Sequence, residues 1–288
     1  MTIRRQTVCS VVIAALLTCS AASAGEAAAL KFSAPKNFVL ALGDSLTFGF
    51  QQAKFDADPF DLAEFHTGFA FVFTQRVRAT PPGKGTTLVN LGCPGETTDS
   101  FLAGPCAYHA AGLPLHANYT GAQMDAALAF LEAHRGQVSP ILISLGANDV
   151  LALADACVVD RMVDPDCLFL GFMGVQEGYG EILARLRVTA PDAEIVVLGF
   201  YNPLALSNPT TNVLAALLNE ALATVATANR VRFADPLPAF NLGAPQPDTL
   251  CFLTLVCTFL PDIHPSDAGY ALIGDLMFEV AGFTRFEH

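Results

Sequence analysis

Five short apolar runs punctuate the chain, at residues 38–42, 87–91, 141–145, 195–200 and 231–234. They are mostly continuous rather than alternating with polar residues. Continuous apolar runs of this length are typical of parallel strands that are buried on both faces. We therefore predict five strands of one parallel sheet.

Segments with helical periodicity lie between and after these runs. Apolar residues recur every three or four positions in residues 60–78, 123–134, 175–189, 213–228 and 269–280. Alternating strands and helices predict an α/β fold, in which right-handed crossovers place helices on both faces of the sheet. The chain contains no repeat and no linker, so we predict one domain over residues 25–288.

Three stretches, at residues 93–122, 150–172 and 241–262, show no periodicity and are longer than usual connections. Each follows the carboxyl end of a predicted strand, the edge at which open α/β sheets bind ligands. Each also contains two cysteines. We expect these stretches to be irregular loops that form the walls of a binding site.

The composition excludes several classes of protein. The 288 residues include 52% hydrophobic and only 15% charged residues, which excludes a disordered chain. The net charge is -12, from 15 Lys+Arg against 27 Asp+Glu. Nucleic acids and anionic membranes need basic patches, so neither is an expected partner.

The N-terminal residues have the order of a secretory signal peptide. Arg4 and Arg5 precede the apolar run 8–17, and Ala22-Ser23-Ala24 forms a small-residue cleavage site. We predict a signal peptide over residues 1–24 and a secreted mature protein. The run is short for a membrane span, and no later segment is apolar for ~18 residues. Lipidation of Cys19 is the rival interpretation, although Thr18 replaces the expected small residue.

Six cysteines remain after the signal peptide, and an even number in an exported chain indicates disulfides. Their intervening segments of 12, 9 and 5 residues differ from the short spacing of zinc sites, so we expect no metal and no cofactor. Six cysteines allow 15 pairings. Pairing of neighbours along the chain is the simplest choice and gives Cys93–Cys106, Cys157–Cys167 and Cys251–Cys257.

Residues that could take part in catalysis follow the predicted strands. The first strand leads into Gly-Asp-Ser, which places Ser45 at a strand-to-helix turn, where the helix N-terminus favours a nucleophilic hydroxyl. Gly92 follows the second strand, and Asn148 follows the third in Gly-Ala-Asn-Asp. Asp262 and His264 belong to Asp-Ile-His-Pro, just before the last helix.

These four motifs, in this order, resemble the SGNH or GDSL hydrolase family. The three local cysteine pairs further resemble its secreted esterases and lipases of actinobacterial type. The resemblance implies a flavodoxin-like three-layer αβα sandwich with strand order 2-1-3-4-5. It also implies that Ser45 is the nucleophile and His264 the general base. The Ser45 and Gly92 backbone N–H groups and the Asn148 amide are implied to form the oxyanion hole.

Physical reasoning agrees with these roles. In that order the first strand lies between the second and third, each about 4.8 Å away, so Gly92 and Asn148 flank Ser45. Converging neutral donors stabilise a tetrahedral oxyanion.

The residue that orients His264 departs from the family pattern. The family's aspartate commonly lies three residues before the histidine, where this chain has Pro261. Pro265 favours an extended segment before it, in which Asp262 and His264 point the same way. We predict that Asp262 orients the imidazole, with a backbone carbonyl as the alternative.

The substrate prediction depends on apolar residues in the three long stretches, which suit an acyl chain, and on the absence of tryptophan. Our first hypothesis is a secreted serine carboxylic-ester hydrolase, an esterase or lipase, acting on aliphatic acyl esters of small molecules or lipids. One alternative is a carbohydrate O-acetyl esterase. A non-catalytic lipid-binding protein on the same fold is another. A flavin-binding module is disfavoured, because Asp44 lies in the loop that would cradle phosphate. The apolar residues of these stretches are Phe101, Leu102, Leu113, Leu115, Leu168, Phe169, Leu170, Phe172, Leu250, Phe252, Leu253, Leu255, Val256, Phe259 and Leu260.

Overall fold

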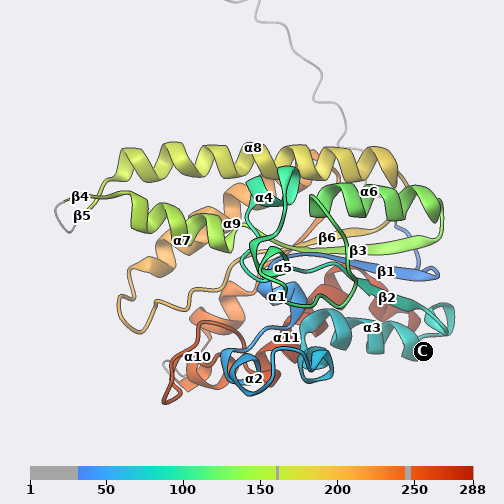
Figure 1. The fold of residues 1–288 in the computed structure, drawn as a ribbon, viewed down its shortest axis with the longest axis horizontal. Coiled ribbons are helices and arrows are strands. Elements are labelled where there is room, and N and C mark those ends of the chain that lie inside the picture. The colour runs from blue at the N-terminus through green and yellow to red at the C-terminus, as the bar shows by residue number, and fades with distance from the viewer. Residues whose placement is uncertain (1–31, 160–161, 244–247, 288) are drawn as a thin grey trace, which may run out of the picture. The chain divides into compact units, whose positions relative to one another are not determined.

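A parallel five-stranded sheet forms the centre of the structure, a computed structural model that describes residues 32–159, 162–243 and 248–287 (Figure 1). The predicted signal peptide lies outside the described residues. The strand order β2-β1-β3-β6-β7 is the predicted 2-1-3-4-5 when only these strands are counted. The four pairings are all parallel, which confirms the predicted fold. The strands are β1 (Phe38–Gly43), β2 (Thr87–Asn90), β3 (Val138–Ser144), β6 (Ile195–Leu198) and β7 (Arg232–Ala234).

Helices cover both faces of this sheet (Figure 1). On one face, α3 (Phe69–Ala79) and α11 (Asp267–Val280) pack against Val39 and Ala41 of β1. On the other face, Leu40 and Leu42 of β1 pack against three helices. Successive side chains of a strand point to opposite faces, so a strand between two helical layers is apolar throughout. The three helices of the second face are α6 (Gln123–Ala133), α8 (Pro165–Thr189) and α9 (Thr211–Ala228).

Shorter elements connect these layers, and several of them lie at the carboxyl ends of the strands. The short α-helices are α1 (Ser45–Phe48), α2 (Gln52–Ala57), α4 (Thr98–Ala103), α5 (Ala107–Ala110), α7 (Ala147–Ala156) and α10 (Asp248–Leu253). The others are η1 (Leu62–Thr67), η2 (Pro81–Gly83), η3 (Pro238–Leu242), η4 (Phe283–Phe286) and the two-stranded sheet β4 (Val158–Val159) and β5 (Met162–Val163).

The prediction of an irregular loop over residues 150–172 is wrong. This stretch contains most of α7, the β4–β5 pair and the first two turns of α8. The start of α8 does have a sequence signal, because Asp164 accepts hydrogen bonds from the Asp166 and Cys167 N–H groups and Pro165 is the first helical residue. In their described residues, the two other long stretches contain the short helices α4, α5 and α10 and the end of η3 in addition to irregular chain.

The helix predicted over residues 60–78 is divided into η1 and α3. The break lies at Gly68, whose Cα region is pressed against Gly49: a Cβ at position 68 would lie 2.5 Å from the Gly49 Cα. Close packing of two backbone segments therefore interrupts an otherwise continuous helical pattern.

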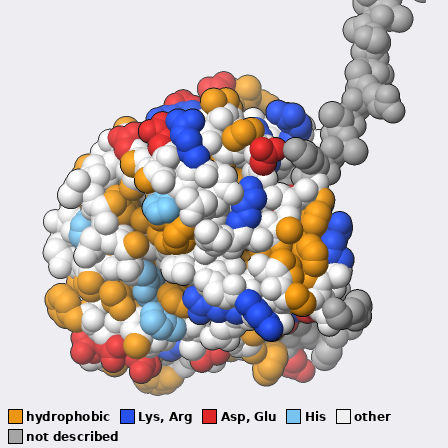
Figure 2. All heavy atoms as spheres, turned by 90° about the vertical axis from the view of Figure 1, so that its right-hand side faces the viewer, with side chains coloured by type: hydrophobic (Ala, Val, Ile, Leu, Met, Phe, Trp, Pro, Cys, Tyr) orange, Lys and Arg blue, Asp and Glu red, His pale blue; other side chains and the backbone are white. Residues whose placement is uncertain are grey.

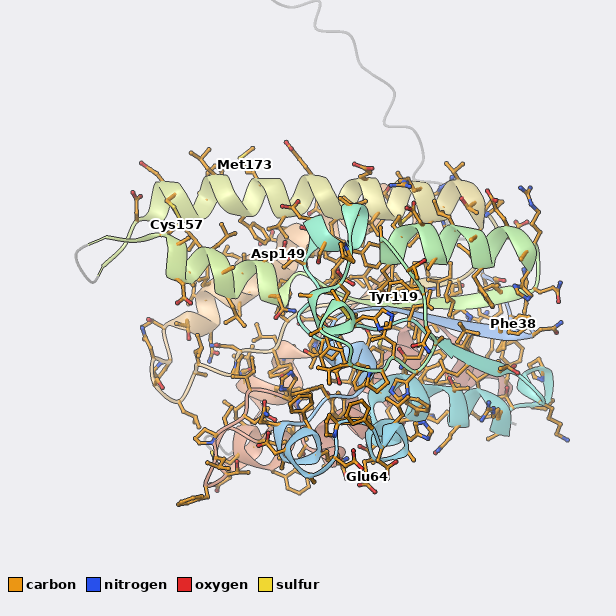
Figure 3. The ribbon with its side chains drawn as sticks, in the orientation of Figure 1. Phe38, Glu64, Tyr119, Asp149, Cys157 and Met173 are labelled. Atoms are coloured by element: carbon orange, nitrogen blue, oxygen red, sulfur yellow. A yellow bond between two sulfur atoms is a disulfide. The ribbon has the colours of Figure 1, made fainter. Side chains whose placement is uncertain are left out.

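The six cysteines form three disulfides, and each joins neighbours along the chain. Cys93–Cys106 closes the loop after β2. Cys157–Cys167 connects the end of α7 to the first turn of α8 (Cys157 is labelled in Figure 3). Cys251–Cys257 links α10 to the loop that follows it. The described pairing is the one that the sequence predicted.

One described helix, α9, is long and apolar enough by length and composition to cross a membrane. This is weak evidence for a span, because core helices of globular domains meet the same criterion. In this fold Leu222 and Ala226 of α9 lie in the core between the sheet and α8.

Candidate active site

Ser45 is the first residue of α1, immediately beyond the carboxyl end of β1. Gly43 has φ +123°, and a Cβ there would lie 1.7 Å from the Ser144 carbonyl oxygen, so only glycine fits. The Asp44 carboxylate accepts a hydrogen bond from the Leu46 N–H and caps the helix. The turn therefore presents the Ser45 hydroxyl at the edge of the sheet, where the helix N-terminus favours developing negative charge.

His264 connects the Ser45 hydroxyl to a carboxylate. Its Nε2 lies 2.9 Å from the Ser45 Oγ, and its Nδ1 lies 2.5 Å from the Asp262 Oδ1. The imidazole ring packs against the ring of Phe50, with centroids 4.9 Å apart. The Tyr201 hydroxyl donates to the carbonyl of Ile263, the residue between Asp262 and His264. The loop before α11 is thus held over Ser45 from several sides.

Asp262, rather than a backbone carbonyl, faces the imidazole Nδ1. Its Oδ1 also accepts from the His264 N–H at 3.1 Å, and its Oδ2 accepts from the Gln52 N–H at 2.8 Å. Burial alone would raise the pKa of this carboxyl, but the hydrogen bonds and charge of His264 and the Gln52 N–H outweigh burial and lower it. Asp262 is therefore a carboxylate at neutral pH and can stabilise an imidazolium.

Asn148 lies in the first turn of α7, beyond the end of β3. Its side-chain Nδ2 donates to the Glu96 carbonyl at 2.9 Å. An amide NH₂ has two hydrogens, so this bond fixes the amide while one N–H stays available. Asn148 lines the same cavity as Ser45 and His264.

Gly92 does not fit the donor role predicted for it. Its N–H donates to the Asn90 Oδ1 at 2.9 Å, and a Cβ there would meet Phe48 N at 2.7 Å. It is packed inside and does not line the cavity. Gly95, three residues later, does line it. Its φ is +82°, and the Gly95 N–H has no acceptor among the described residues.

A buried polar network holds the segment that carries Gly95. The Glu96 carboxylate accepts from the Ser100 hydroxyl at 2.5 Å and from the Gln123 Nε2 at 2.9 Å. Gln123 also bonds the backbone N–H and carbonyl of Gly43, and the Tyr119 hydroxyl completes the cluster (labelled in Figure 3). The network ties the chain beside Gly95 to the end of β1. Sequence reasoning missed it, because Gln123 looks like an ordinary first residue of a helix.

Asp44 and Asp149 act as hydrogen-bond acceptors. The Asp149 carboxylate (Figure 3) accepts from the Thr98 N–H and hydroxyl. The Asp44 carboxylate accepts from the Ser144 hydroxyl as well as from the Leu46 N–H. Complete burial raises the pKa of Asp44 to about 7.

A cavity of about 350 Å³ opens from Ser45, His264 and Asn148 toward α7 and α9. Beyond these polar groups its walls are apolar. None of the apolar residues that we expected from the three long stretches lines it; several, including Phe101 and Leu250, are buried under their own loops. The apolar lining includes Leu145, Val150, Leu151, Ala154, Leu198, Phe200, Leu204, Leu214, Ala215, Leu218 and Ile263.

One group of described side chains is close enough to share a metal ion: Cys93, Glu96 and Cys106. The two cysteine sulfurs are bonded to each other, and the Glu96 oxygens accept hydrogen bonds within the network. This group is therefore structural.

Comparison with known proteins gives a consistent result. The model of the GDSL-like lipase/acylhydrolase family matches residues 41–272. No curated protein matches the chain. Three solved structures illustrate the similarity in fold. An acetylxylan esterase from Geobacillus stearothermophilus is 16% identical, with a TM-score of 0.57 over 87% of this chain and 96% of that one. A lipase from a goat rumen metagenome is 18% identical, with a TM-score of 0.56 over 87% and 99%. An α/β hydrolase from the metagenome of Lake Arreo, Spain, is 19% identical, with a TM-score of 0.54 over 87% and 97%.

Proposed function

The chain belongs to the GDSL-like lipase/acylhydrolase family and is a serine ester hydrolase, and on this premise we propose that it is a secreted hydrolase of aliphatic acyl esters. The observation that carries the proposal is the hydrogen-bonded line from Ser45 through His264 to Asp262, at the mouth of an apolar cavity. In this proposal the three residues act as nucleophile, general base and orienting carboxylate.

Acylation begins when the Ser45 Oγ attacks the carbonyl carbon of the ester. The hydroxyl proton moves to the His264 Nε2, 2.9 Å away, and the Asp262 carboxylate stabilises the resulting imidazolium. The tetrahedral intermediate then expels the alkoxide, which takes the proton from the imidazolium. Ser45 is left as an acyl ester, and water hydrolyses it by the same steps with His264 again accepting a proton.

The oxyanion of each intermediate needs preorganised neutral donors. We assign these to the backbone N–H groups of Ser45 and Gly95 and to the free N–H of the Asn148 amide. The Ser45 N–H belongs to the first turn of α1, where amides have no intrahelical acceptor. Gly95 replaces Gly92 in this role, because the Gly92 N–H already donates to Asn90. Losing one such donor typically costs ~10²–10³ in rate.

The apolar cavity supports an aliphatic acyl group as the substrate's larger part. From Ser45 the cavity continues between Leu151 and Ala154 of α7 and Leu214 and Leu218 of α9. Its volume lies in the range of small-molecule sites. An acetyl group would leave most of this volume unfilled, so we expect longer acyl chains to gain transition-state binding from it.

Secretion is the second part of the proposal. The three disulfides fit an oxidising compartment, and the predicted signal peptide supplies the route. Mass spectrometry of protein exported by a bacterial host tests this: a mature N-terminus at Gly25 supports cleavage after Ala24, whereas an acylated Cys19 supports a lipoprotein.

Hydrolysis of nitrophenyl esters with two to sixteen acyl carbons tests the activity, with Ser45→Ala as the control. We expect an optimum beyond acetate and loss of nearly all turnover in Ser45→Ala. Faster release of acetate from acetylated xylan than from any nitrophenyl ester would favour the carbohydrate esterase. Undiminished turnover in Ser45→Ala would remove the proposed mechanism, and binding of esters without turnover would favour the lipid-binding alternative.

A further inference from the structure

Large apolar side chains around the cavity mouth are exposed, and several of them do not line the cavity. Leu214 on α9 and Ile263 before the catalytic histidine line the cavity from two sides, and both are more than one third exposed. Beside them lie further large apolar residues that do not line the cavity. We call these the apolar rim: Leu206, Val213, Leu217, Phe259 and Leu260.

Each part of the apolar rim is close in sequence to a residue that lines the cavity: Leu206 to Leu204, Val213 and Leu217 to Leu214, and Phe259 and Leu260 to Ile263. Val213 and Leu217 are neighbours of Leu214 on the first two turns of α9, since residues three and four apart share a helix face. They are 65% and 57% exposed. Phe259 and Leu260 precede Ile263 in the loop after the Cys251–Cys257 disulfide. Phe259 is 98% exposed, so its ring contacts almost nothing in this chain.

The rim and the two exposed cavity residues together present roughly 600 Å² of apolar surface, if each fully exposed side chain offers ~150 Å². This is the upper end of the ~300–600 Å² range of the largest apolar patch on a typical monomeric protein, and such a patch is often functional.

Charge is distributed unequally between the two ends of the sheet. Lysines and arginines of the described chain, Lys54 excepted, lie near or just after the C-terminal ends of helices, or precede or begin strands, which places them at the amino-terminal edge of the sheet, opposite the cavity. Figure 2 looks onto that opposite side and shows Lys and Arg side chains spread over it. The described lysines and arginines other than Lys54 are Lys36, Arg76, Arg78, Lys84, Arg135, Arg185, Arg187, Arg230, Arg232 and Arg285.

Lys54 lies at the cavity end but is already paired. Its ammonium lies 3.1 Å from the Asp267 carboxylate and also donates to the Thr67 hydroxyl. Anionic membranes attract proteins through clusters of free Lys and Arg near the surface. The rim end of the described chain offers no such cluster, and the whole chain carries a net charge of -12. An anionic lipid surface is therefore repelled, whereas an uncharged one is not.

We propose that the apolar rim docks the protein on an uncharged lipid surface that holds its ester substrate. The inference rests on the proposed function. The rim is continuous with the cavity through Leu214 and Ile263, so on the docked protein an acyl chain can pass from lipid to the cavity without crossing water. Phe259 and Leu260 insert into the lipid from one side of the mouth and Val213 and Leu217 from the other.

Flotation of the full chain with vesicles tests the docking. The probes are vesicles of dioleoylphosphatidylcholine, and the same vesicles with one third of the lipid replaced by dioleoylphosphatidylglycerol. We compare the wild type with Val213→Ser/Leu217→Ser and with Phe259→Ser/Leu260→Ser. The matched control is Val188→Ser, which removes a side chain that is 82% exposed on the last turn of α8, at the opposite end.

We expect each rim double variant to bind phosphatidylcholine vesicles at least tenfold more weakly than the wild type and the Val188→Ser control. Hydrolysis of dissolved nitrophenyl butyrate should stay within twofold, because no rim residue lines the cavity. The N-terminal segment is the same in all variants, so differences among them report the rim. The anionic vesicles should bind the wild type more weakly than the uncharged ones.

Three results would overturn the docking. Rim variants that float like the wild type would show that the rim does not bind lipid. Tighter binding of the wild type to the anionic vesicles would contradict the charge argument. A wild-type dimer in sedimentation, abolished by the rim substitutions, would make a second copy of the chain the occupant. Flotation of Ser45→Ala separates this inference from the proposed function, since docking needs no turnover.

Discussion

Replacing Asp262 by asparagine removes one negative charge beside His264 and exchanges one acceptor oxygen for a donor. The wild-type carboxylate accepts three hydrogen bonds, from the His264 Nδ1–H and N–H and from the Gln52 N–H. An asparagine cannot accept all three with its single oxygen. The amide of the variant can therefore take two orientations, with either its oxygen or its NH₂ group facing His264.

Both orientations predict a large loss of kcat. If the amide oxygen faces His264, the base keeps its tautomer but loses the carboxylate charge; for charge centres about 4 Å apart at an effective dielectric constant of 20, this is ~4 kcal/mol, or about 10³ in rate. If the NH₂ faces His264, the imidazole proton is driven to Nε2, which can then no longer accept from Ser45. That wrong tautomer costs ~10⁴ in the analogous serine protease variant. We expect a loss of ~10³–10⁴.

The assay is kcat for nitrophenyl butyrate hydrolysis by Asp262→Asn, beside His264→Ala and the wild type. Asp267→Asn is the matched control, because the Asp267 carboxylate bonds Lys54 and Gln51 rather than the imidazole, and it should stay within twofold. Thermal melts check that every variant is folded. A folded Asp262→Asn within tenfold of wild type, beside an inactive His264→Ala, would show a dyad and refute this reasoning.

Three further predictions follow from the cavity, the buried acid and the third disulfide. Ala154→Phe should fill the cavity and lower kcat/KM for octanoyl esters at least tenfold, while kcat/KM for acetyl esters changes less than twofold. Ala156→Phe, exposed on the same helix, should change neither value. The same dependence on acyl-chain length in Ala154→Phe and the wild type would disprove the acyl site. The pKa of Asp44, raised by burial from 3.8 to about 7, means that the folded protein binds more protons than the unfolded one between these values, so this residue lowers stability as pH rises from about 4 to 7. In denaturant melts, the free energy of unfolding of Asp44→Asn relative to the wild type should be higher at pH 8 than at pH 4 by up to about 4 kcal/mol. An unchanged pH dependence would contradict the shift in the pKa of Asp44. Cys251→Ser/Cys257→Ser should lower kcat more than tenfold and the free energy of unfolding by only about 2 kcal/mol. The reason is that the loop closed by this disulfide donates a hydrogen bond from the Leu255 N–H to the His264 carbonyl. An unaltered kcat in the variant would show that the disulfide does not position the histidine.

The sheet could be predicted from the sequence because its strands are buried on both faces. Runs such as residues 38–42 have one strong signal, continuous apolarity. The helix α7 and the start of α8 have no clear helical period of apolar residues. The first turns of α8 expose Phe169, Leu170 and Met173, so apolar residues lie on both the inner and the outer side of the helix and the helical period is lost.

The candidate site could be predicted as far as motifs fix it. Ser45, Asn148, Asp262 and His264 are brought together as their motifs indicated. The choice between Gly92 and Gly95 could not be made, since both lie in the same short segment between β2 and α4. It depends on whether the Asn90 side chain occupies the nearby N–H, which only the folded packing decides.

The cavity walls could not be predicted either, for a related reason. Leu214 and Leu218 have the spacing of a core-facing helix. A lining residue and a core residue are both apolar and both buried from one side. They differ only in whether a neighbouring element fills the space, and the periodicity of one helix carries no information about that.

The segregation of cations at the end opposite the cavity has a consequence for the end of the catalytic cycle. An ester enters as a neutral molecule, but hydrolysis leaves a carboxylate anion and a proton. The donors around Ser45 are neutral, and the nearest described ammonium, Lys54, is held by Asp267. The acid product therefore meets no free positive charge among the described residues on its way out, and the net charge of -12 repels it. The same distribution of charge thus limits inhibition by the acid product.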